Sequence, residues 1–204
     1  MSEAEYWDSG WLNRRFEPPN NFARRAYKLI KARNLKKVLD LGSGNGRDSV
    51  YFFRKGLQVT ALDFSKSGIG ILKSRFPEIE CITADIREMD FQDDSYDDSY
   101  DVIYAHLGLQ YFDDGLTGEI FNRLHNVLKT GGLFFVKCKS VDDYLFGEGE
   151  KVGENMYERG HVRHFFSKDY MREKLHRFRI ISIRRTTSMY GGRRSSFIEA
   201  VATK

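Results

Sequence analysis

The sequence predicts an α/β fold: a doubly wound, mostly parallel sheet of seven strands, with helices on both faces and one antiparallel strand near the C-terminus. Short apolar runs alternate with segments of helical periodicity from about residue 36 to 139, and such alternation is typical of βαβ units. The last two apolar runs, at 180–185 and 197–202, have no helix between them. Their connection through Gly191 and Gly192 suits a hairpin, so one of these strands is expected to run antiparallel to the others.

Local signals place the individual elements along the chain. Asn20 and Asn21 are suited to cap a helix, Gly56 and Pro77 end two later helices, and Ser167 caps the last one. The expected helices lie at residues 22–33, 48–55, 67–76, 113–129 and 167–177. The expected strands lie at residues 36–41, 57–62, 80–84, 100–105, 133–139, 180–185 and 197–202, with a turn at 130–132.

Three stretches fall outside this alternation. Residues 1–35 combine an aromatic-rich start with the first helix, and the aromatic residues of the start could form part of a lid over the site or be docked in the core. Residues 140–166 show no clear periodicity and contain several glycines, which is typical of a substrate-facing loop. The first copy of a tandem Asp-Asp-Ser-Tyr repeat within residues 90–101 is expected to be a solvated loop. No stretch has linker composition, so residues 1–204 are expected to form a single domain.

The composition is that of a globular protein with a small basic excess. Hydrophobic residues make up 41% of the 204, and 33 basic against 29 acidic residues give a net charge of +4. This excess is compatible with nucleic-acid binding but does not argue for it. Cys81 and Cys138 lie in separate apolar runs, as reduced core thiols do. The sequence shows neither a signal-peptide pattern nor an apolar run of membrane-spanning length, so we expect a cytoplasmic protein without a membrane partner.

The chain is organised around a glycine-rich turn, Asp40-Leu41-Gly42-Ser43-Gly44-Asn45-Gly46, between an apolar strand and a helix. Glycine lets a backbone approach a ligand, and the start of the helix leaves N–H groups free. A dinucleotide site needs a third glycine where Arg47 or Ser49 stands, and the Gly-Lys-Ser/Thr ending of a P-loop is also missing. Asp40 would repel a pyrophosphate but suits a cationic ligand.

Three acids lie at or next to the carboxyl ends of successive strands: Asp40, Asp63 and Asp85. Ligands of open α/β sheets bind beyond these ends. Asp63 can accept both hydroxyls of a ribose, and Asp85 can accept an exocyclic amine. With Asp40 they indicate an adenosine that carries a cationic, amino-acid-like tail, which is S-adenosylmethionine. Taken singly, Asp63 and Asp85 could also be ordinary turn residues at strand ends.

Five motifs, in order and spacing, resemble those of class I S-adenosylmethionine-dependent methyltransferases. They are Asp40 to Gly46, Leu62-Asp63-Phe64-Ser65, Ala84-Asp85-Ile86, Asp101 to His106, and Leu128 to Leu133. The resemblance runs from about residue 36 to 139, and it implies the same doubly wound fold. The helix start from Gly44 to Ser49, followed by Tyr51-Phe52, further resembles the small tellurite-resistance-type and thiopurine-type methyltransferases, which act on small, soft nucleophiles.

The resemblance implies that the first motif holds the methionine part of the cofactor. The backbone at Gly42, Gly44 and Gly46 would pass under the methionine and the ribose. Asp40 would meet the methionine ammonium, directly or through water.

The later motifs are implied to hold the adenosine and to approach the reacting methyl group. Asp63 would bind the ribose, with Phe64 against one face of the adenine or simply in the core. Asp85 would accept from the adenine amine, and the Ile86 N–H would donate to a ring nitrogen. His106 would lie near the methyl group, either as a general base or as a hydrogen-bonded part of the pocket lining.

A second cluster, His161, Arg163 and His164, precedes the last expected helix. These side chains could bind an anionic group of a substrate or serve as a base, or they could be solvated beside the helix cap. Asp113 and Asp114 are better explained as helix N-terminal charge than as metal ligands, so no metal site is expected. The sequence therefore predicts methyl transfer from S-adenosylmethionine to a small-molecule nucleophile by in-line displacement.

Two alternatives remain open at this point: an RNA or protein methyltransferase, and a non-catalytic protein that binds S-adenosylmethionine as a regulator. The signature of amino-directed base methyltransferases is missing where Ala105-His106-Leu107-Gly108 stands. The pairs Arg184-Arg185 and Arg193-Arg194 have no interleaved aromatic residues. Nucleic acid is therefore not the expected partner.

Overall fold

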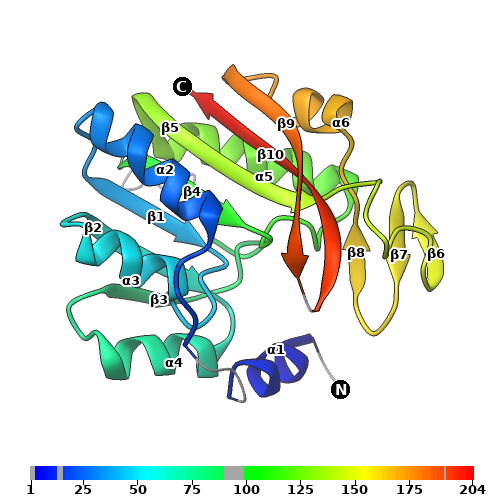
Figure 1. Cartoon of the computed structure of the whole chain (residues 1–204), viewed down its shortest axis with the longest axis horizontal. Helices are drawn as coiled ribbons and strands as arrows, with labels where there is room; N and C mark the ends of the chain where they lie inside the picture. The colour runs from blue at the N-terminus through cyan, green and yellow to red at the C-terminus, as the bar shows by residue number, and fades with distance from the viewer. Residues whose placement is uncertain (1–2, 13–15, 90–98, 191) are drawn as a thin grey trace.

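A seven-stranded sheet runs through the middle of the computed structural model, in the order β3-β2-β1-β4-β5-β10-β9 (Figure 1). The structure describes residues 3–12, 16–89, 99–190 and 192–204. The strands of this sheet are β1 (Lys37–Leu41), β2 (Gln58–Asp63), β3 (Glu80–Thr83), β4 (Tyr100–His106), β5 (Leu128–Lys139), β9 (Arg179–Tyr190) and β10 (Arg193–Thr203). Neighbours from β3 to β5 pair in parallel, whereas β10 is antiparallel to both β5 and β9. The predicted fold class is confirmed.

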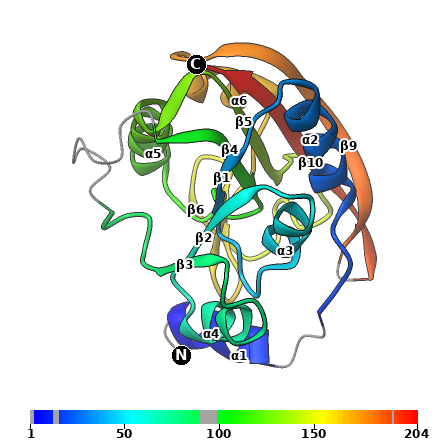
Figure 2. The ribbon, with the colours of Figure 1, turned by 90° about the vertical axis from the view of Figure 1, so that its left-hand side faces the viewer.

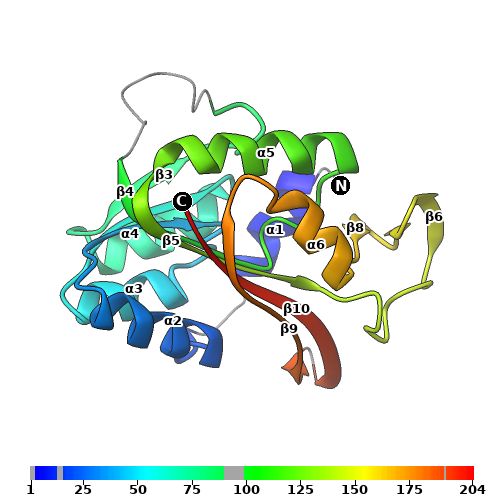
Figure 3. The same cartoon turned by 90° about the horizontal axis from the view of Figure 1, so that it is seen from above.

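Helices cover both faces of the sheet, with α2 and α3 on one face and α5 and α6 on the other (Figure 3). The helices are α1 (Glu3–Leu12), α2 (Asn21–Ala32), α3 (Arg47–Arg54), α4 (Lys66–Arg75), α5 (Asp114–Val127) and α6 (Lys168–Lys174). Side-chain oxygens of Asn20, Ser65, Asp113 and Ser167 accept from first-turn N–H groups, so each fixes where its helix begins. None of the described helices is long and apolar enough to cross a membrane.

Successive side chains of the central strands point to opposite faces and build two apolar cores. The core under α2 and α3 includes Val38, Val102, Tyr104, Leu133 and Phe135. The core under α5 and α6 includes Leu39, Leu41, Ile103, Phe134 and Val136. On the α2 side the apolar series stops at the carboxyl ends of the strands, where Asp40, His106 and Lys137 follow at the same alternation. The pleat therefore directs these three polar side chains to one place above the core.

The region predicted as a loop at 140–166 is partly ordered as a second, three-stranded sheet, which corrects that prediction. Its strands are β6 (Glu150–Gly153), β7 (Met156–Glu158) and β8 (Val162–His164), paired antiparallel. Strands of three or four residues are too short to show a period of two in the sequence. Their packing comes from aromatic rings, because Phe146 lies 5.2 Å from Tyr157 and 5.5 Å from Phe165 between ring centroids.

The sheet and the N-terminus contain further differences from the sequence prediction. β5 begins at Leu128 rather than at residue 133. The turn expected at 130–132 lies inside this strand, where Gly131 has φ +80°. β9 and β10 are also longer than expected. The helix α1, which lies beside α4, was not predicted as a regular element (Figure 2). The acidic repeat from 90 to 98 and the hairpin residue Gly191 lie outside the described residues.

A buried ion pair at the end of β5 is hydrogen-bonded to the start of β10. Lys139 Nζ lies 3.0 Å from Asp143 Oδ2, with side chains 1% and 0% exposed. The same ammonium donates to Ser195 Oγ at 2.9 Å, and Asp143 accepts the Ser196 N–H at 2.8 Å. Removing one partner of such a pair leaves an uncompensated charge in the core.

We predict that Asp143→Ala lowers the free energy of unfolding by about 3–5 kcal/mol, because Lys139 loses its buried counter-ion. Urea unfolding followed by circular dichroism measures this change. The control is Glu148→Ala, which removes the exposed pair between Glu148 and Arg159 and should cost about 1 kcal/mol or less. Equal, small losses for both variants would contradict the predicted role of the buried pair.

Candidate active site

A cavity of about 660 Å³ lies at the carboxyl ends of β1, β2, β4 and β5, with α1, the start of α2 and the β9–β10 hairpin contributing to its walls. The strand order reverses between β1 and β4, so this is the switch point of the sheet. The cavity is lined by most of the residues predicted from the sequence, namely Asp40, Gly42, Asp63, Phe64, Asp85, Ile86 and His106. The structure thus brings together residues that lie as far as 66 positions apart in the chain (106 − 40).

The glycine turn is held against the neighbouring strands by its backbone. The N–H groups of Gly42 and Ser43 donate to Leu62 O at 2.9 and 3.1 Å. Gly42 has φ +69°, and a Cβ at this position would lie 3.0 Å from Gly108 Cα, so the ends of β1 and β4 meet at a backbone contact. The Ser43 hydroxyl is buried and has no hydrogen-bond partner among the described residues. It lines the cavity and is available to a polar ligand.

Asp63 at the end of β2 connects the turn to α4. The carboxylate, 6% exposed, accepts the Gly44 N–H and the Ser65 N–H, both at 2.8 Å. Burial raises the pKa of Asp63, and the two N–H bonds oppose this shift. Because each carboxylate oxygen of Asp63 already accepts one backbone N–H, the fold fixes the direction in which the remaining lone pairs point.

Asp40 at the end of β1 is more deeply buried. It is 2% exposed and accepts the Ser49 hydroxyl at 2.5 Å. Burial, followed by the charges of Asp48 and Asp63, raises the pKa of Asp40 to about 8. The carboxyl group is therefore protonated at neutral pH until a cation comes close.

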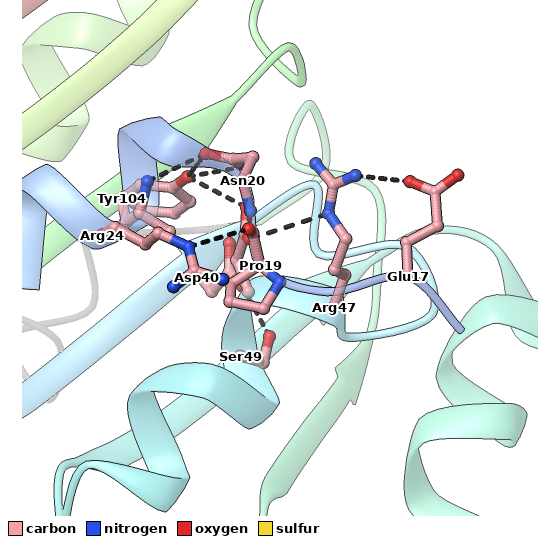
Figure 4. Close-up of polar contacts among 10 residues, drawn as sticks. Glu17, Pro19, Asn20, Arg24, Asp40, Arg47, Ser49 and Tyr104 are labelled. Carbon is pink, nitrogen blue, oxygen red and sulfur yellow. Dashed lines mark hydrogen bonds and ion pairs between the residues drawn. The ribbon is translucent and has the colours of Figure 1, made fainter.

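Asp48 at the start of α3 forms a second buried acid next to Asp40. It accepts the Tyr104 hydroxyl at 2.9 Å and the Asn20 backbone N–H at 3.2 Å, and the Asn20 side-chain amide also donates to it. Figure 4 labels the two donor residues, Asn20 and Tyr104. Burial raises the pKa of Asp48, while Arg47 and these donors oppose the shift. Asn20 also caps α2, so one residue ties the first long helix to the acid cluster.

The adenine side of the predicted site is formed after β3. Asp85 lines the cavity, and its carboxylate accepts the Arg87 N–H at 2.9 Å and Arg87 Nε at 2.8 Å. Burial would raise the pKa of Asp85, but the bonds from Arg87 lower it below its ordinary value. Phe64 and Ile86 line the cavity together with Asp85.

His106 lies at the end of β4, next to a row of charged residues on the neighbouring strands. In the register of the sheet His106 faces Lys137 on β5, and Lys137 faces Glu199 on β10. Glu199 in turn faces Arg184 on β9. Burial, followed by the charges of Lys137 and Arg47, keeps the pKa of His106 well below its usual value. Its imidazole is therefore neutral at neutral pH.

Helix α1 covers the glycine turn from outside. A Cβ at Gly44 would lie 2.3 Å from the ring of Trp11, so the ring packs directly on this glycine. Asp8 accepts the Ser65 hydroxyl at 2.5 Å and the Ser67 N–H at 3.0 Å, which attaches α1 to the start of α4. Trp7 and Trp11 both line the cavity.

The second predicted cluster does not line the cavity. His161 packs on Trp7 and Tyr111, with ring centroids 5.6 and 5.4 Å away, and these two residues do line it. Arg163 Nη2 lies 2.5 Å from His161 Nε2, and burial followed by this charge lowers the pKa of His161 to about 4. His164, only 2% exposed, packs on α6. Gly44 and Gly46 also lie outside the lining, and they pack against Trp11 and Leu72.

Several residues of the site were not singled out by the sequence. They are Asn20, Arg25, Asp48, Tyr104, Lys137 and Glu199. Lys137 and Glu199 had a usable signal, since each is a charged residue inside an apolar strand and such residues need a partner. Asn20 and Tyr104 gave no such signal in the sequence, because the roles of helix cap and core aromatic residue account for them fully.

Comparison with known proteins agrees with this geometry. Residues 38–132 match a family model described as a methyltransferase domain. A demethylmenaquinone methyltransferase from Chlorobaculum tepidum is 29% identical over 115 residues, which are 56% of this chain and 45% of that protein. The chain thus spans about half the length of the curated relatives it matches.

Solved structures share the fold. An S-adenosylmethionine-dependent methyltransferase from Methanosarcina mazei superposes with a TM-score of 0.74 at 18% identity, over 86% of this chain and 96% of that one. The 1,6-didemethyltoxoflavin-N1-methyltransferase of Burkholderia thailandensis, solved with 1,6-didemethyltoxoflavin and S-adenosylhomocysteine, gives 0.67 at 20% identity, over 90% and 78% of the two chains. Residues 38–132 of this chain thus match a methyltransferase domain, and the chain shares its fold with S-adenosylmethionine-dependent methyltransferases of known structure.

Proposed function

We propose that this chain binds S-adenosylmethionine in the cavity at the switch point and transfers its methyl group to a small-molecule nucleophile. The observation that carries the proposal is that Asp40, Asp63 and Asp85 share one cavity with the glycine turn. An acid that ionises beside a cation, an acid for a ribose and an acid for an amine are what an adenosine with an amino-acid tail requires. The demethylmenaquinone and 1,6-didemethyltoxoflavin methyltransferases described above are named for small-molecule acceptors, which supports the same class of acceptor here.

Each part of the cofactor has candidate partners in the cavity. Asp40 would hold the methionine ammonium, and the Ser43 hydroxyl, to which no described residue is hydrogen-bonded, fits a polar group beside it. Asp63 would hold the ribose hydroxyls, and Phe64, Asp85 and the Ile86 N–H would hold the adenine. Gly42 lines the cavity, and its lack of a side chain lets the turn lie against the backbone of Gly108. When bound, the cofactor supplies an activated methyl group on a sulfonium, and transfer leaves S-adenosylhomocysteine.

We assign proton removal from the acceptor to His106. A neutral imidazole at the end of β4 can accept a proton, and its depressed pKa keeps it neutral across the physiological range. Helix α1 acts as the lid over the cofactor, with Trp11 on the glycine turn. His161 and Arg163 affect the site indirectly, because His161 packs against Trp7 and Tyr111, which form part of the cavity wall. The cavity excludes water and aligns the reactants.

The two other functions predict different contacts. An RNA acceptor requires a cationic surface with stacking aromatic rings, and the aromatic residues of this site lie inside the cavity instead. A regulator that only binds the cofactor does not need a half-buried, neutral histidine beside it. Cys81 and Cys138 are free thiols, which fits the reducing cytoplasm as the proposed location.

We expect S-adenosylhomocysteine to bind the full chain, and Asp63→Asn to weaken this binding by about 1.5–3 kcal/mol, because a charged acceptor of hydroxyl bonds is lost. Isothermal titration measures both affinities. Asp169→Asn serves as the matched control, since Asp169 is an exposed carboxylate on α6. Absence of binding to the unmodified chain would sink the proposed function.

Cofactor binding should also release a proton at Asp40. Its carboxyl group is protonated below about pH 8 in the free protein, and a nearby ammonium lowers that pKa. At about pH 6.5 we expect release of about one proton per bound S-adenosylhomocysteine, declining above about pH 8, where the free carboxyl group is already ionised. Titrations in buffers with different ionisation enthalpies count the protons.

Asp40→Asn is the control for this proton count, because Asp63 also has a raised pKa. The variant should abolish most of the release. Release that is unchanged in Asp40→Asn would show that Asp40 is not the group that meets the ammonium.

A further inference from the structure

One wall of the cavity concentrates cations around a single buried carboxylate. We call it the cationic wall; it consists of Arg25 on α2, Lys137 on β5 and Glu199 on β10, which line the cavity, and of Arg184 on β9, which pairs with Glu199 from outside the lining. Lys137 Nζ lies 3.2 Å from Glu199 Oε1, and Arg184 Nε lies 3.3 Å from Oε2. Arg25 Nη2 donates to both oxygens, at 2.8 and 2.6 Å. Three cations thus share one anion, which leaves an excess of positive charge.

The geometry leaves Lys137 with bonding capacity toward the cavity. Its side chain is 8% exposed, and it lines the cavity together with Arg25 and Glu199. An ammonium has three N–H donors. One is directed to Glu199, and the ring of Phe197 lies 4.2 Å from Nζ. Burial lowers the pKa of Lys137, while the charge of Glu199 opposes this shift. The ion pair with Glu199 therefore favours the charged ammonium form of Lys137.

Other charges near the wall do not cancel the excess. Asp48 faces Lys137 from α3, but its neighbour Arg47 lies 3.7 Å from it and also pairs with Glu17 at 2.6 Å. His106 beside Lys137 is neutral. Arg25, Lys137, Arg184 and Arg47 are four cations, and they face three carboxyl groups, those of Glu199, Asp48 and Glu17, so an anion placed against Lys137 meets a net positive charge.

The same part of the cavity has aromatic sides. Phe22 lies 6.4 Å from the ring of His106, and Phe197 lies 6.1 Å from Tyr190, between ring centroids. All four of these residues line the cavity. Rings in the wall favour a flat, unsaturated ligand through stacking and edge contacts.

We propose that the methyl acceptor is a flat aromatic molecule with an acidic group, a carboxylate or an acidic hydroxyl, that binds as the anion against Lys137 and Arg25. This inference rests on the proposed function, because it names the class of acceptor for the same site. Lys137 and Arg25 determine specificity here, and an ammonium and a guanidinium both bond an oxyanion more strongly than a neutral oxygen.

The test measures binding of small probes to the full chain, with and without saturating S-adenosylhomocysteine. Benzoate is compared with benzamide, and 4-nitrophenol with 4-nitroanisole, so each acid has a neutral counterpart of similar shape. We expect one of the acids to bind about tenfold or more tightly than its counterpart. The pair that shows this preference distinguishes a carboxylate from an acidic hydroxyl.

Three variants locate the preference. Lys137→Met should reduce it to about threefold or less, because the ammonium is lost while the chain length is kept. Arg25→Met is a second variant at a more exposed side chain, 41% exposed, in case the first one fails to fold, and it should reduce the preference in the same direction. Lys129→Met removes a charge from the far end of the same strand, where Lys129 pairs with Asp101, and should leave the preference unchanged.

The outcomes separate this inference from the proposed function. Equal binding of acids and neutral probes, no measurable binding of either acid, or a preference that survives both Lys137→Met and Arg25→Met would overturn the acidic acceptor. Failure of S-adenosylhomocysteine to bind while the preference for the acid persists would overturn the proposed function and leave the anion site standing.

Discussion

The structure depends on how three buried carboxyl groups at one edge of the sheet are supplied with hydrogen-bond donors. Asp40, Asp48 and Asp63 are 2%, 6% and 6% exposed. Buried carboxyl groups are costly unless they are neutral or hydrogen-bonded. Each one therefore draws a different part of the chain to the site, and the site and the fold around it cannot be separated.

The donors to these acids come from different elements. Asp48 is bonded by Tyr104 on β4 and by Asn20, which begins α2. Asp63 is bonded by the N–H groups of the glycine turn and of the residue that begins α4. Loss of one carboxyl group therefore loosens a helix start as well as a ligand contact. The geometry of the cavity is a consequence of this network.

The cavity has two electrostatic ends, and the sheet register explains why. On the β1–β2 side the residues that end the strands are acids, which suit a cationic ligand. On the β5–β10 side the register brings Lys137 and Glu199 together, and Arg25 from α2 adds a second cation. A cofactor with a positive tail and an acceptor with a negative group would be attracted to different ends. His106 lies between them, at the end of β4.

The fold was largely predictable from the sequence, because the parallel strands carry strong apolar runs and Asn20 and Ser167 are clear helix caps. The glycine turn and the acids after β1, β2 and β3 were predictable for the same reason: their position follows from the strand ends. The sequence did not reveal α1 or the short strands β6–β8, whose order depends on aromatic contacts such as that of Phe146 with Tyr157.

The cationic wall also escaped prediction, for a different reason. Lys137 and Glu199 are 62 residues apart (199 − 137), and only the antiparallel register of β5 and β10 makes them neighbours. The cluster at 161–164 was conspicuous in sequence, yet β8 directs His164 toward α6 and away from the cavity. Charge in a sequence identifies residues that need partners, while the sheet register decides which partners they meet.

The central claim is that the cofactor and the acceptor share this one cavity, with the sulfur between the acids and the cationic wall. A crystal structure of the chain with S-adenosylhomocysteine tests it most directly. We predict the adenine beside Asp85 and Ile86, the ribose at Asp63, the amino group within hydrogen-bond distance of Asp40, and the sulfur facing His106 and Lys137. Density for the nucleoside elsewhere on the molecule, or a sulfur directed away from β4 and β5, would contradict it.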